Sequence, residues 1–431
     1  MKKNENLSNI GLQNKYKQIA ISEFNPNEFF FQKKDKNLSI IIKIMFIMIY
    51  FSIIILIEKL YRDYLFQISI PFQENIQKNK NYLIILKISR RISTFGKEKW
   101  YFFIYRVIFL LLPLNHSLLA LQALIYSSYW TNTLKMVYKS DRPNWRSDYL
   151  TFLCNYGYGN PSGHAFTCFT FYLTLAHILI VYWKITGIRK IVIFIFFSLF
   201  SFFIALSRII VGAHSINQII YGYSLGLGFY FILIHIIGYH KYFPNNFLHH
   251  IKKKKINYIY LGFHLFLFIL SVVIYLFTET KDHSDLESTI FNGIRCKKKN
   301  PYSKYKNEGL FKSLNIWCLI GAQLGIYLLF KFLKASNYVI NGSIIEWNKS
   351  NIYTFLLRMP IIILSSFGLI FYFFIPGNSP LIYIFVFKSG LSSFITMVGI
   401  HFVGIYLSIY FKVANSEIFK MDVLSEIISE I

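Results

Sequence analysis

The sequence predicts an all-α, polytopic membrane protein with about ten transmembrane helices. Of its 431 residues, 55% are hydrophobic and only 15% are charged, which is too little charge for a water-soluble chain of this length. The apolar residues also come in blocks near the roughly 20 residues that an α-helix needs to cross a bilayer. Because the first 38 residues are polar and rich in lysine and asparagine, we expect no cleavable signal peptide before these blocks.

The apolar blocks define the predicted spans in chain order. They cover residues 39–57, 101–114, 117–137, 165–183, 191–208, 216–238, 257–277, 314–333, 355–375 and 381–411. The second block is short and the last is long, so the count lies between roughly nine and eleven. The predicted parts of the chain are a polar cytosolic N-terminus (1–38), an additional transmembrane helix (39–63), a core (64–240), a C-terminal extension of about four helices (241–412) and a cytosolic tail (413–431).

The net charge of +26 is concentrated in loops beside the spans, at 29–37, 183–190 and 249–257. Basic loops that flank apolar spans are typical of the cytoplasmic side of a membrane. No nucleic-acid motif accompanies them, so we expect membrane lipids and not nucleic acid as partners of these charges. Oligomeric state does not follow from this pattern.

Three short fragments carry ionisable groups at span edges, where charge is costly unless it is used or solvated. They are "KMVYKSDRP" (135–143), "PSGH" (161–164) and "SRIIVGAHSINQ" (207–218). Taken singly, the first and third fit interfacial cations, and PSGH fits a turn with a helix cap. Together they obey a stronger constraint, because the fourth predicted span leaves the membrane face that carries PSGH and the fifth returns to it. All three fragments therefore meet at one face.

The residues of these fragments suit a phosphate group. Arg142 and Arg208 each present a planar fork of donors, and Lys135 adds a mobile charge. Ser162 offers a hydroxyl, and Gly163 lets a backbone N–H approach an anion at the start of the fourth span.

Two histidines accompany these cations. Of His164 and His214, one imidazole can attack phosphorus while the other protonates the leaving oxygen. We expect no metal and no cofactor, because fixed cations neutralise the charge and the fragments hold no carboxylate cluster of the kind that magnesium prefers.

The order K-x6-RP, PSGH and SR-x5-H resembles the three signatures of the type-2 phosphatidic acid phosphatase superfamily, which implies that superfamily's helical core for residues 64–240. The resemblance implies a phosphoric monoester hydrolase in which His214 is the nucleophile that forms a phosphohistidine and His164 is the general acid. It also implies which side chains hold the phosphate: Lys135, Arg142, Ser162, Gly163 and Arg208.

One departure favours a particular branch. Most of the superfamily has an Asp four residues after the nucleophile, where this chain has Gln218, which could still orient the His214 ring. The glucose-6-phosphatase branch also carries Gln there, and "CNYGYGNPSGHA" (154–165) is similar to a stretch of that family, with Asn155 in place of a usual Glu. The similarity extends loosely over roughly residues 64–411. It implies a sugar phosphate such as glucose 6-phosphate as substrate.

Two alternatives stay open. A lipid phosphate (phosphatidate, sphingosine phosphate or a polyprenyl diphosphate) fits the same chemistry, and a non-catalytic membrane relative fits the same fold. Lys184, Arg189 and Lys190 lie opposite the fragments, so the positive-inside rule predicts a lumenal or extracytosolic site, in the endoplasmic reticulum or another endomembrane. Cys154 and Cys296 fall in loops on that side, where a disulfide between them is one possibility.

Overall fold

The computed structural model describes residues 36–112, 114–147, 149–150, 152, 157–237, 258–279, 313–335, 338–339, 352–367, 390–410 and 419–420. The chain divides into two compact units, residues 1–48 and 49–431. The described part of the first unit is the start of helix α2 (Lys36–Lys78), whose apolar side chains from Ile41 to Met48 are largely exposed. All other described elements belong to the second unit.

The described elements are helical apart from one short pair of strands. In chain order they are α2 (Lys36–Lys78), η1 (Lys80–Tyr82), α3 (Leu83–Ile92), η2 (Ser93–Gly96), α4 (Glu98–Leu111), α5 (Leu114–Tyr138), α6 (Pro143–Arg146), α7 (Gly163–Tyr182), α8 (Ile188–Ile210), α9 (Ile216–Ile232), η3 (Leu233–Ile237), α11 (Tyr258–Glu279), η4 (Leu314–Ile316), α14 (Trp317–Ala335), β1 (Tyr338–Val339), α15 (Ile352–Ser365), α18 (Ser392–Val398), η7 (Gly399–Gly404), α19 (Ile405–Tyr410) and β2 (Phe419–Lys420). Strands β1 and β2 pair antiparallel, with Tyr338 opposite Lys420. The all-α fold class is therefore confirmed for the described residues.

Among the described residues, four helices are long and apolar enough to cross a membrane: Ile41–Lys78, Gly163–Tyr182, Ile188–Ile210 and Ile216–His235. Shorter apolar helices cover Trp100–Leu111, Leu261–Phe277, Leu314–Leu329, Leu356–Ser365 and Ser392–Ser408. Helix α5 is long, but buried polar side chains such as Gln122 and Asn132 make it less apolar. The apolar helices indicate membrane association, while the count of ten spans is not confirmed.

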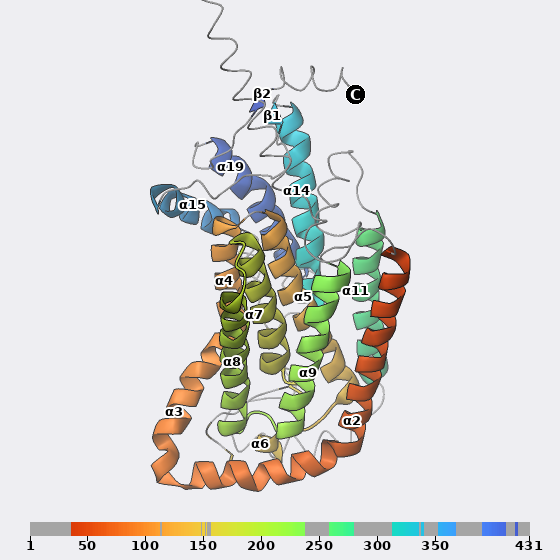
Figure 1. The fold of residues 1–431 in the computed structure, drawn as a ribbon, viewed down its shortest axis with the longest axis vertical. Helices are drawn as coiled ribbons and strands as arrows, with labels where there is room; N and C mark the ends of the chain where they lie inside the picture. Colours follow the sequence, from red (N-terminus) through yellow and green to blue (C-terminus); the bar gives the residue numbers. More distant parts are fainter. Residues whose placement is uncertain are drawn as a thin grey trace, which may run out of the picture. The chain divides into compact units, whose positions relative to one another are not determined.

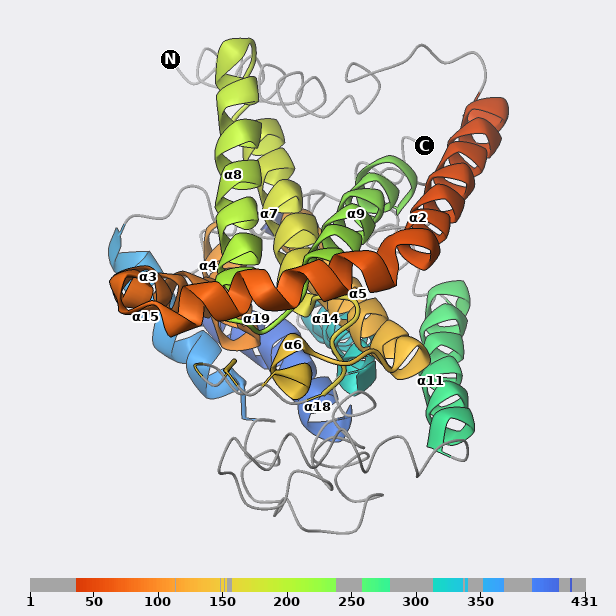
Figure 2. The ribbon, with the colours of Figure 1, turned by 90° about the horizontal axis from the view of Figure 1, so that it is seen from below.

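Helix α2 differs from the predicted first span, because it continues well beyond residue 57, to Lys78. The charged residues from Glu58 to Asp63 end the apolar block but not the helix, since Glu58, Lys59 and Arg62 are good helix formers. Glu58 and Arg62 form an i,i+4 ion pair of 3.0 Å, which stabilises this stretch. Figures 1 and 2 show the later part of α2 running across the ends of α8 and α9.

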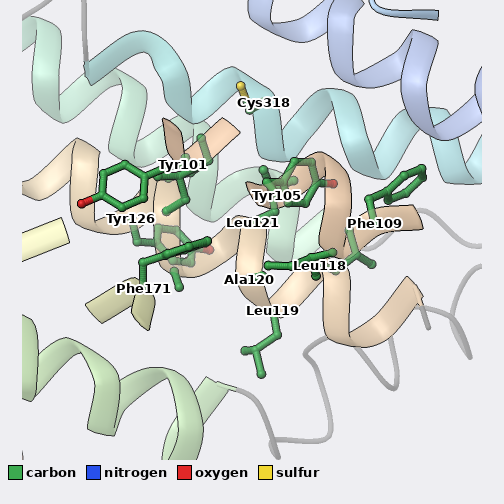
Figure 3. Close-up of a cluster of buried hydrophobic side chains, with 14 of the residues drawn as sticks. Tyr101, Tyr105, Phe109, Leu118, Leu119, Ala120, Leu121, Tyr126, Phe171 and Cys318 are labelled. Atoms are coloured by element: carbon green, nitrogen blue, oxygen red, sulfur yellow. The ribbon is translucent and has the colours of Figure 1, made fainter. Parts of the chain in front are cut away.

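The hydrophobic core of the second unit lies where α4, α5 and α7 pack against one another. Figure 3 shows Tyr101, Tyr105 and Phe109 of α4 among leucines of α5, with Phe171 from α7 beside them. Cys168 and Cys318 are buried and free. Cys168 Sγ lies 2.7 Å from the hydroxyl oxygen of Tyr101, so this thiol belongs to the packing of the core.

Helix α7 is central in this unit and packs against α5, α8 and α9. Two glycines let the backbone of α9 approach α7 closely. A Cβ at Gly222 would lie 2.8 Å from the carbonyl oxygen of Ser162, and one at Gly226 would lie 2.9 Å from that of Phe166. Small residues four apart are a common way for helices to pack in a membrane. This packing brings the start of α9 beside the start of α7.

Candidate active site

The three fragments lie at neighbouring helix ends. Lys135 is in the last turn of α5, and Arg142 directly precedes α6. Ser162 is the N-cap residue of α7, so PSGH ends where this helix begins. Arg208 is in the last turn of α8, and His214 lies in the loop before α9. The chain leaves this end along α7 and returns to it along α8, as the sequence predicts (Figure 1).

Arg142 joins the first fragment to the third. Its Nε donates to the carbonyl oxygen of Gly157 at 2.6 Å, and its Nη2 donates to that of Tyr158 at 3.2 Å. Its Nη1 donates to the carbonyl oxygen of Ala213 at 2.9 Å and lies 3.1 Å from Nε2 of His214. Because the guanidinium is planar and buried, these contacts fix its orientation beside the imidazole.

Gln218 fixes the orientation of the His214 ring. Its Nε2 donates to the carbonyl oxygen of Asp141 at 2.6 Å, so its Oε1 is the atom that faces Nδ1 of His214, at 3.1 Å. The backbone N–H of Ser215 donates to the same Oε1 at 3.3 Å. Because a carbonyl oxygen only accepts, Nδ1 carries the ring proton and Nε2 keeps its lone pair. The ring therefore presents an unprotonated Nε2 toward Arg142.

Gly159 provides the space for this amide contact. A Cβ at this position would collide with Nε2 of Gln218 and lie 2.6 Å from the carbonyl oxygen of Asp141. The backbone N–H of Gly159 donates to Ser140 at 2.8 Å, which holds the chain in place. The glycine before PSGH is therefore required by the close approach of Gln218.

His214 is kept neutral by its surroundings. Burial lowers the pKa of its imidazole well below the usual histidine value, and the positive charges of Arg142, Arg208 and Lys135 lower it further. The charge of His164 acts in the same direction. The structure thus brings all five predicted ionisable residues into one electrostatic neighbourhood, and that neighbourhood favours an imidazole able to act as a nucleophile.

The start of α7 lies directly against this group. The backbone N–H of Ser162 donates to the carbonyl oxygen of Gln218 at 3.0 Å, and Ser162 Oγ accepts from the N–H of Ala165 at 3.5 Å. A Cβ at Gly163 would lie 3.7 Å from Nζ of Lys135. The helix N-terminus and the lysine therefore lie close together, and both would stabilise an anion bound between them.

His164 and Arg208 contact the η2 turn, a part of the chain that the sequence argument did not single out. A Cβ at Gly96 would collide with Cδ2 of His164, so only a glycine allows the ring this position. Nη1 of Arg208 donates to Oγ of Ser93 at 2.5 Å, while Nε of Arg208 has no hydrogen-bond partner within the described part of the chain. No sequence signal marks Ser93 and Gly96, because neither residue carries charge.

Two other predictions remain open: the disulfide between Cys154 and Cys296, and the absence of a metal ion. Cys154 and Cys296 lie outside the described residues, so their pairing stays a prediction. Among the residues that the structure describes, no three His, Cys, Asp or Glu side chains gather in a group that could hold a metal ion.

All eight predicted site residues fall between Lys135 and Gln218. A comparison with protein families matches residues 116–242 of the chain to the PAP2 superfamily. The PAP2 match covers all eight site residues, α5 from its third residue and the helices from α6 to α9, and it implies phosphatase-type activity on a phosphorylated substrate. It does not distinguish the glucose-6-phosphatase branch from the others. No curated protein and no solved structure matches the chain.

Proposed function

We propose that the protein is an integral membrane phosphatase that hydrolyses a phosphomonoester through a phosphohistidine on His214. The observation that carries the proposal is the pair of contacts on this ring: Gln218 holds Nδ1, and Nε2 faces Arg142 at 3.1 Å. A phosphate bound by Arg142 would therefore lie next to the lone pair of Nε2. The PAP2 match to residues 116–242 supports the same class of reaction.

The proposed reaction has two displacements at phosphorus. In the first, Nε2 of His214 forms the N–P bond, the ester P–O bond breaks, and protonated His164 gives its proton to the leaving oxygen. In the second, His164 takes a proton from water, the water oxygen attacks phosphorus, and the N–P bond breaks. The sum is one ester and one water converted to an alcohol and phosphate, with both histidines restored.

The remaining groups stabilise charge on the phosphoryl oxygens. The guanidinium groups of Arg142 and Arg208 and the ammonium group of Lys135 are fixed at the site before reaction, so little reorganisation is needed in the transition state. The backbone N–H groups after Ser162 and Gly163 add the dipole of α7. Because these charges belong to the protein, we expect turnover in the presence of EDTA.

Within this class, we favour a sugar phosphate such as glucose 6-phosphate. The support is Gln218, the residue that the glucose-6-phosphatase branch also carries. A lipid phosphate is the alternative substrate. The loop at 278–313, which would roof the site for a soluble sugar phosphate, lies outside the described residues at 280–312. We place the site on the lumenal side of the endoplasmic reticulum or another endomembrane, since the basic residues around Lys184 lie at the opposite ends of α7 and α8.

A substrate panel on the purified, detergent-solubilised protein with EDTA tests the proposal. The panel contains glucose 6-phosphate, phosphatidate, sphingosine phosphate and a polyprenyl diphosphate. We expect release of phosphate from at least one of them, together with a labelled phosphoenzyme that is acid-labile and base-stable, as a phosphohistidine is. His214→Ala should abolish both signals, whereas His235→Ala, a change at an exposed histidine of η3, should leave them unchanged.

Two outcomes would contradict the proposal in different ways. If the wild-type protein turns over no phosphate ester, the catalytic function is wrong and a non-catalytic relative is the better description. If turnover survives in His214→Ala, the chemistry stands but the nucleophile is wrongly assigned.

A further inference from the structure

We infer that the second half of α2, residues 58–78, positions the nucleophile, and that Gln73 is the residue through which it acts. We call this segment the α2 arm. The inference rests on the proposed function, because it concerns the same His214. Nothing in the PAP2 match covers it, since the arm precedes residue 116.

The first observation is a direct contact between the arm and the nucleophile loop. Nε2 of Gln73 donates to the carbonyl oxygen of His214 itself, at 2.7 Å. One turn earlier, Oγ of Ser69 accepts from the backbone N–H of Ile216 at 2.9 Å and donates to Leu65 at 2.5 Å. Both Gln73 and Ser69 are fully buried, so water does not replace these bonds. The arm therefore holds the loop on both sides of Ser215.

These contacts satisfy backbone groups that have no hydrogen-bond partner within helix α9. Helix α9 begins at Ile216, and its first acceptor is the carbonyl oxygen of Ser215, which receives the N–H of Ile219. The carbonyl of His214 and the N–H of Ile216 thus lie outside the helical ladder, where buried backbone groups need another partner. Gln73 and Ser69 supply these two partners.

The second observation is that the arm also reaches the other two fragments. Asn160, which immediately precedes PSGH, donates from Nδ2 to Oε1 of Glu58 at 2.6 Å. Arg62 pairs with the same carboxylate, and its Cζ lies 4.7 Å from the ring centre of Tyr138, at the end of α5. One helix segment therefore contacts the ends of α5, α7 and α9 together.

A role in positioning follows from what the attack requires. Nucleophilic attack depends on the placement of Nε2, and a displacement of about 1 Å can cost about a hundredfold in rate. Gln218 fixes the rotation of the ring, whereas Gln73 fixes the backbone from which the ring projects. Gln73 does not reach the phosphate, so it is a positioning residue that acts through His214.

The test compares the same substitution at two glutamines of α2. Gln73→Met keeps the length of the side chain and removes the donor, while Gln67→Met makes that change at an exposed position. We expect Gln73→Met to lower kcat by about tenfold or more, to slow formation of the phosphoenzyme equally, and to leave KM within about twofold. Gln67→Met should match the wild type. A loss of folded protein alone would lower the active fraction without slowing phosphoenzyme formation per active site.

Hydrogen exchange of the peptide that spans residues 209–220 gives a second readout that needs no activity. The N–H groups of His214, Ser215 and Ile216 are all hydrogen-bonded, to Arg208, Gln218 and Ser69. Exchange in this peptide should be faster in Gln73→Met than in the wild type. If Gln73→Met does not fold, Ser69→Ala replaces it, with the same expected result. Ser52→Ala, an exposed position on the same helix, serves as the control for Ser69→Ala.

The outcomes separate the two proposals. Wild-type kcat and wild-type exchange in Gln73→Met would overturn the role of the arm. Faster hydrogen exchange with unchanged kcat would also overturn it, because loosening of the 209–220 loop would then have no effect on the reaction. Absence of turnover in the wild-type protein would contradict the proposed function alone, and the exchange of the 209–220 peptide would then decide whether the arm holds the loop.

Discussion

Gln218 takes part in three hydrogen bonds around His214, the proposed nucleophile, and it stands where the superfamily that the three fragments resemble usually has a carboxylate. Its Oε1 accepts from Nδ1 of His214 and from the N–H of Ser215, while its Nε2 donates to Asp141. An aspartate would stabilise a positive imidazolium more strongly. The neutral amide fixes the tautomer but stabilises an imidazolium less, and the positive charges of Arg142, Arg208 and Lys135 disfavour that cation further.

We predict that Gln218→Ala lowers kcat by about 10- to 100-fold, because the ring loses its orientation but keeps its nucleophilic nitrogen. His214→Ala should abolish turnover, so the two variants differ clearly in kcat and in phosphoenzyme yield measured side by side. Complete inactivation of Gln218→Ala, with the fold intact by circular dichroism, would show that the amide does more than orient the ring.

At the scale of elements, the close contact between α7 and α9 sets the geometry of the site. Gly222 lies against Ser162, the N-cap of α7, and Gly226 lies one turn further from the site. Oγ1 of Thr170 donates to the carbonyl oxygen of Gly226 at 3.2 Å, which fixes the register of the two helices. Because Ser162 also bonds to Gln218, any separation of α7 from α9 displaces PSGH from His214.

We predict that Gly222→Ala reduces both stability and activity. The added methyl group would lie 2.8 Å from a backbone carbonyl oxygen, which cannot move without shifting the start of α7, and overpacking of this kind costs about 1–3 kcal/mol. The matched control is Gly262→Ala in α11, where an added Cβ meets no atom within 4 Å. Thermal unfolding in detergent and kcat measure the two effects. Equal behaviour of the two variants would mean that the contact is not required.

The sequence predicts the convergence of Arg142, Ser162 and His214 because it depends only on counting membrane crossings between charged fragments. The α2 arm could not be predicted in this way. Gln73 and Ser69 are uncharged, and an isolated Gln in a polar stretch has no pattern that distinguishes a buried contact from solvation. Hydropathy also ends the first predicted span near residue 57, since it measures transfer to lipid and not the continuity of a helix.

At the scale of the whole molecule, the basic loop around Lys184 and the candidate site lie at opposite ends of α7 and α8. The site gathers at the start of α7 and the end of α8, whereas Lys184 and Arg189 lie where α7 ends and α8 begins. During membrane insertion, short loops that carry basic residues tend to stay in the cytosol. In the proposed orientation, the loop at Lys184 therefore also determines which compartment holds the substrate.

We predict that the two ends react with thiol reagents from opposite sides of the membrane. In a background with the four native cysteines replaced, Thr186→Cys marks the basic loop, and Asn75→Cys marks the exposed side of the α2 arm. A membrane-impermeant maleimide added to intact microsomes should label Thr186→Cys at once, and Asn75→Cys only after permeabilisation. The reverse pattern would place the site in the cytosol, and it would mean that the basic segment before α4, with Arg90 and Arg91, outweighs the loop at Lys184.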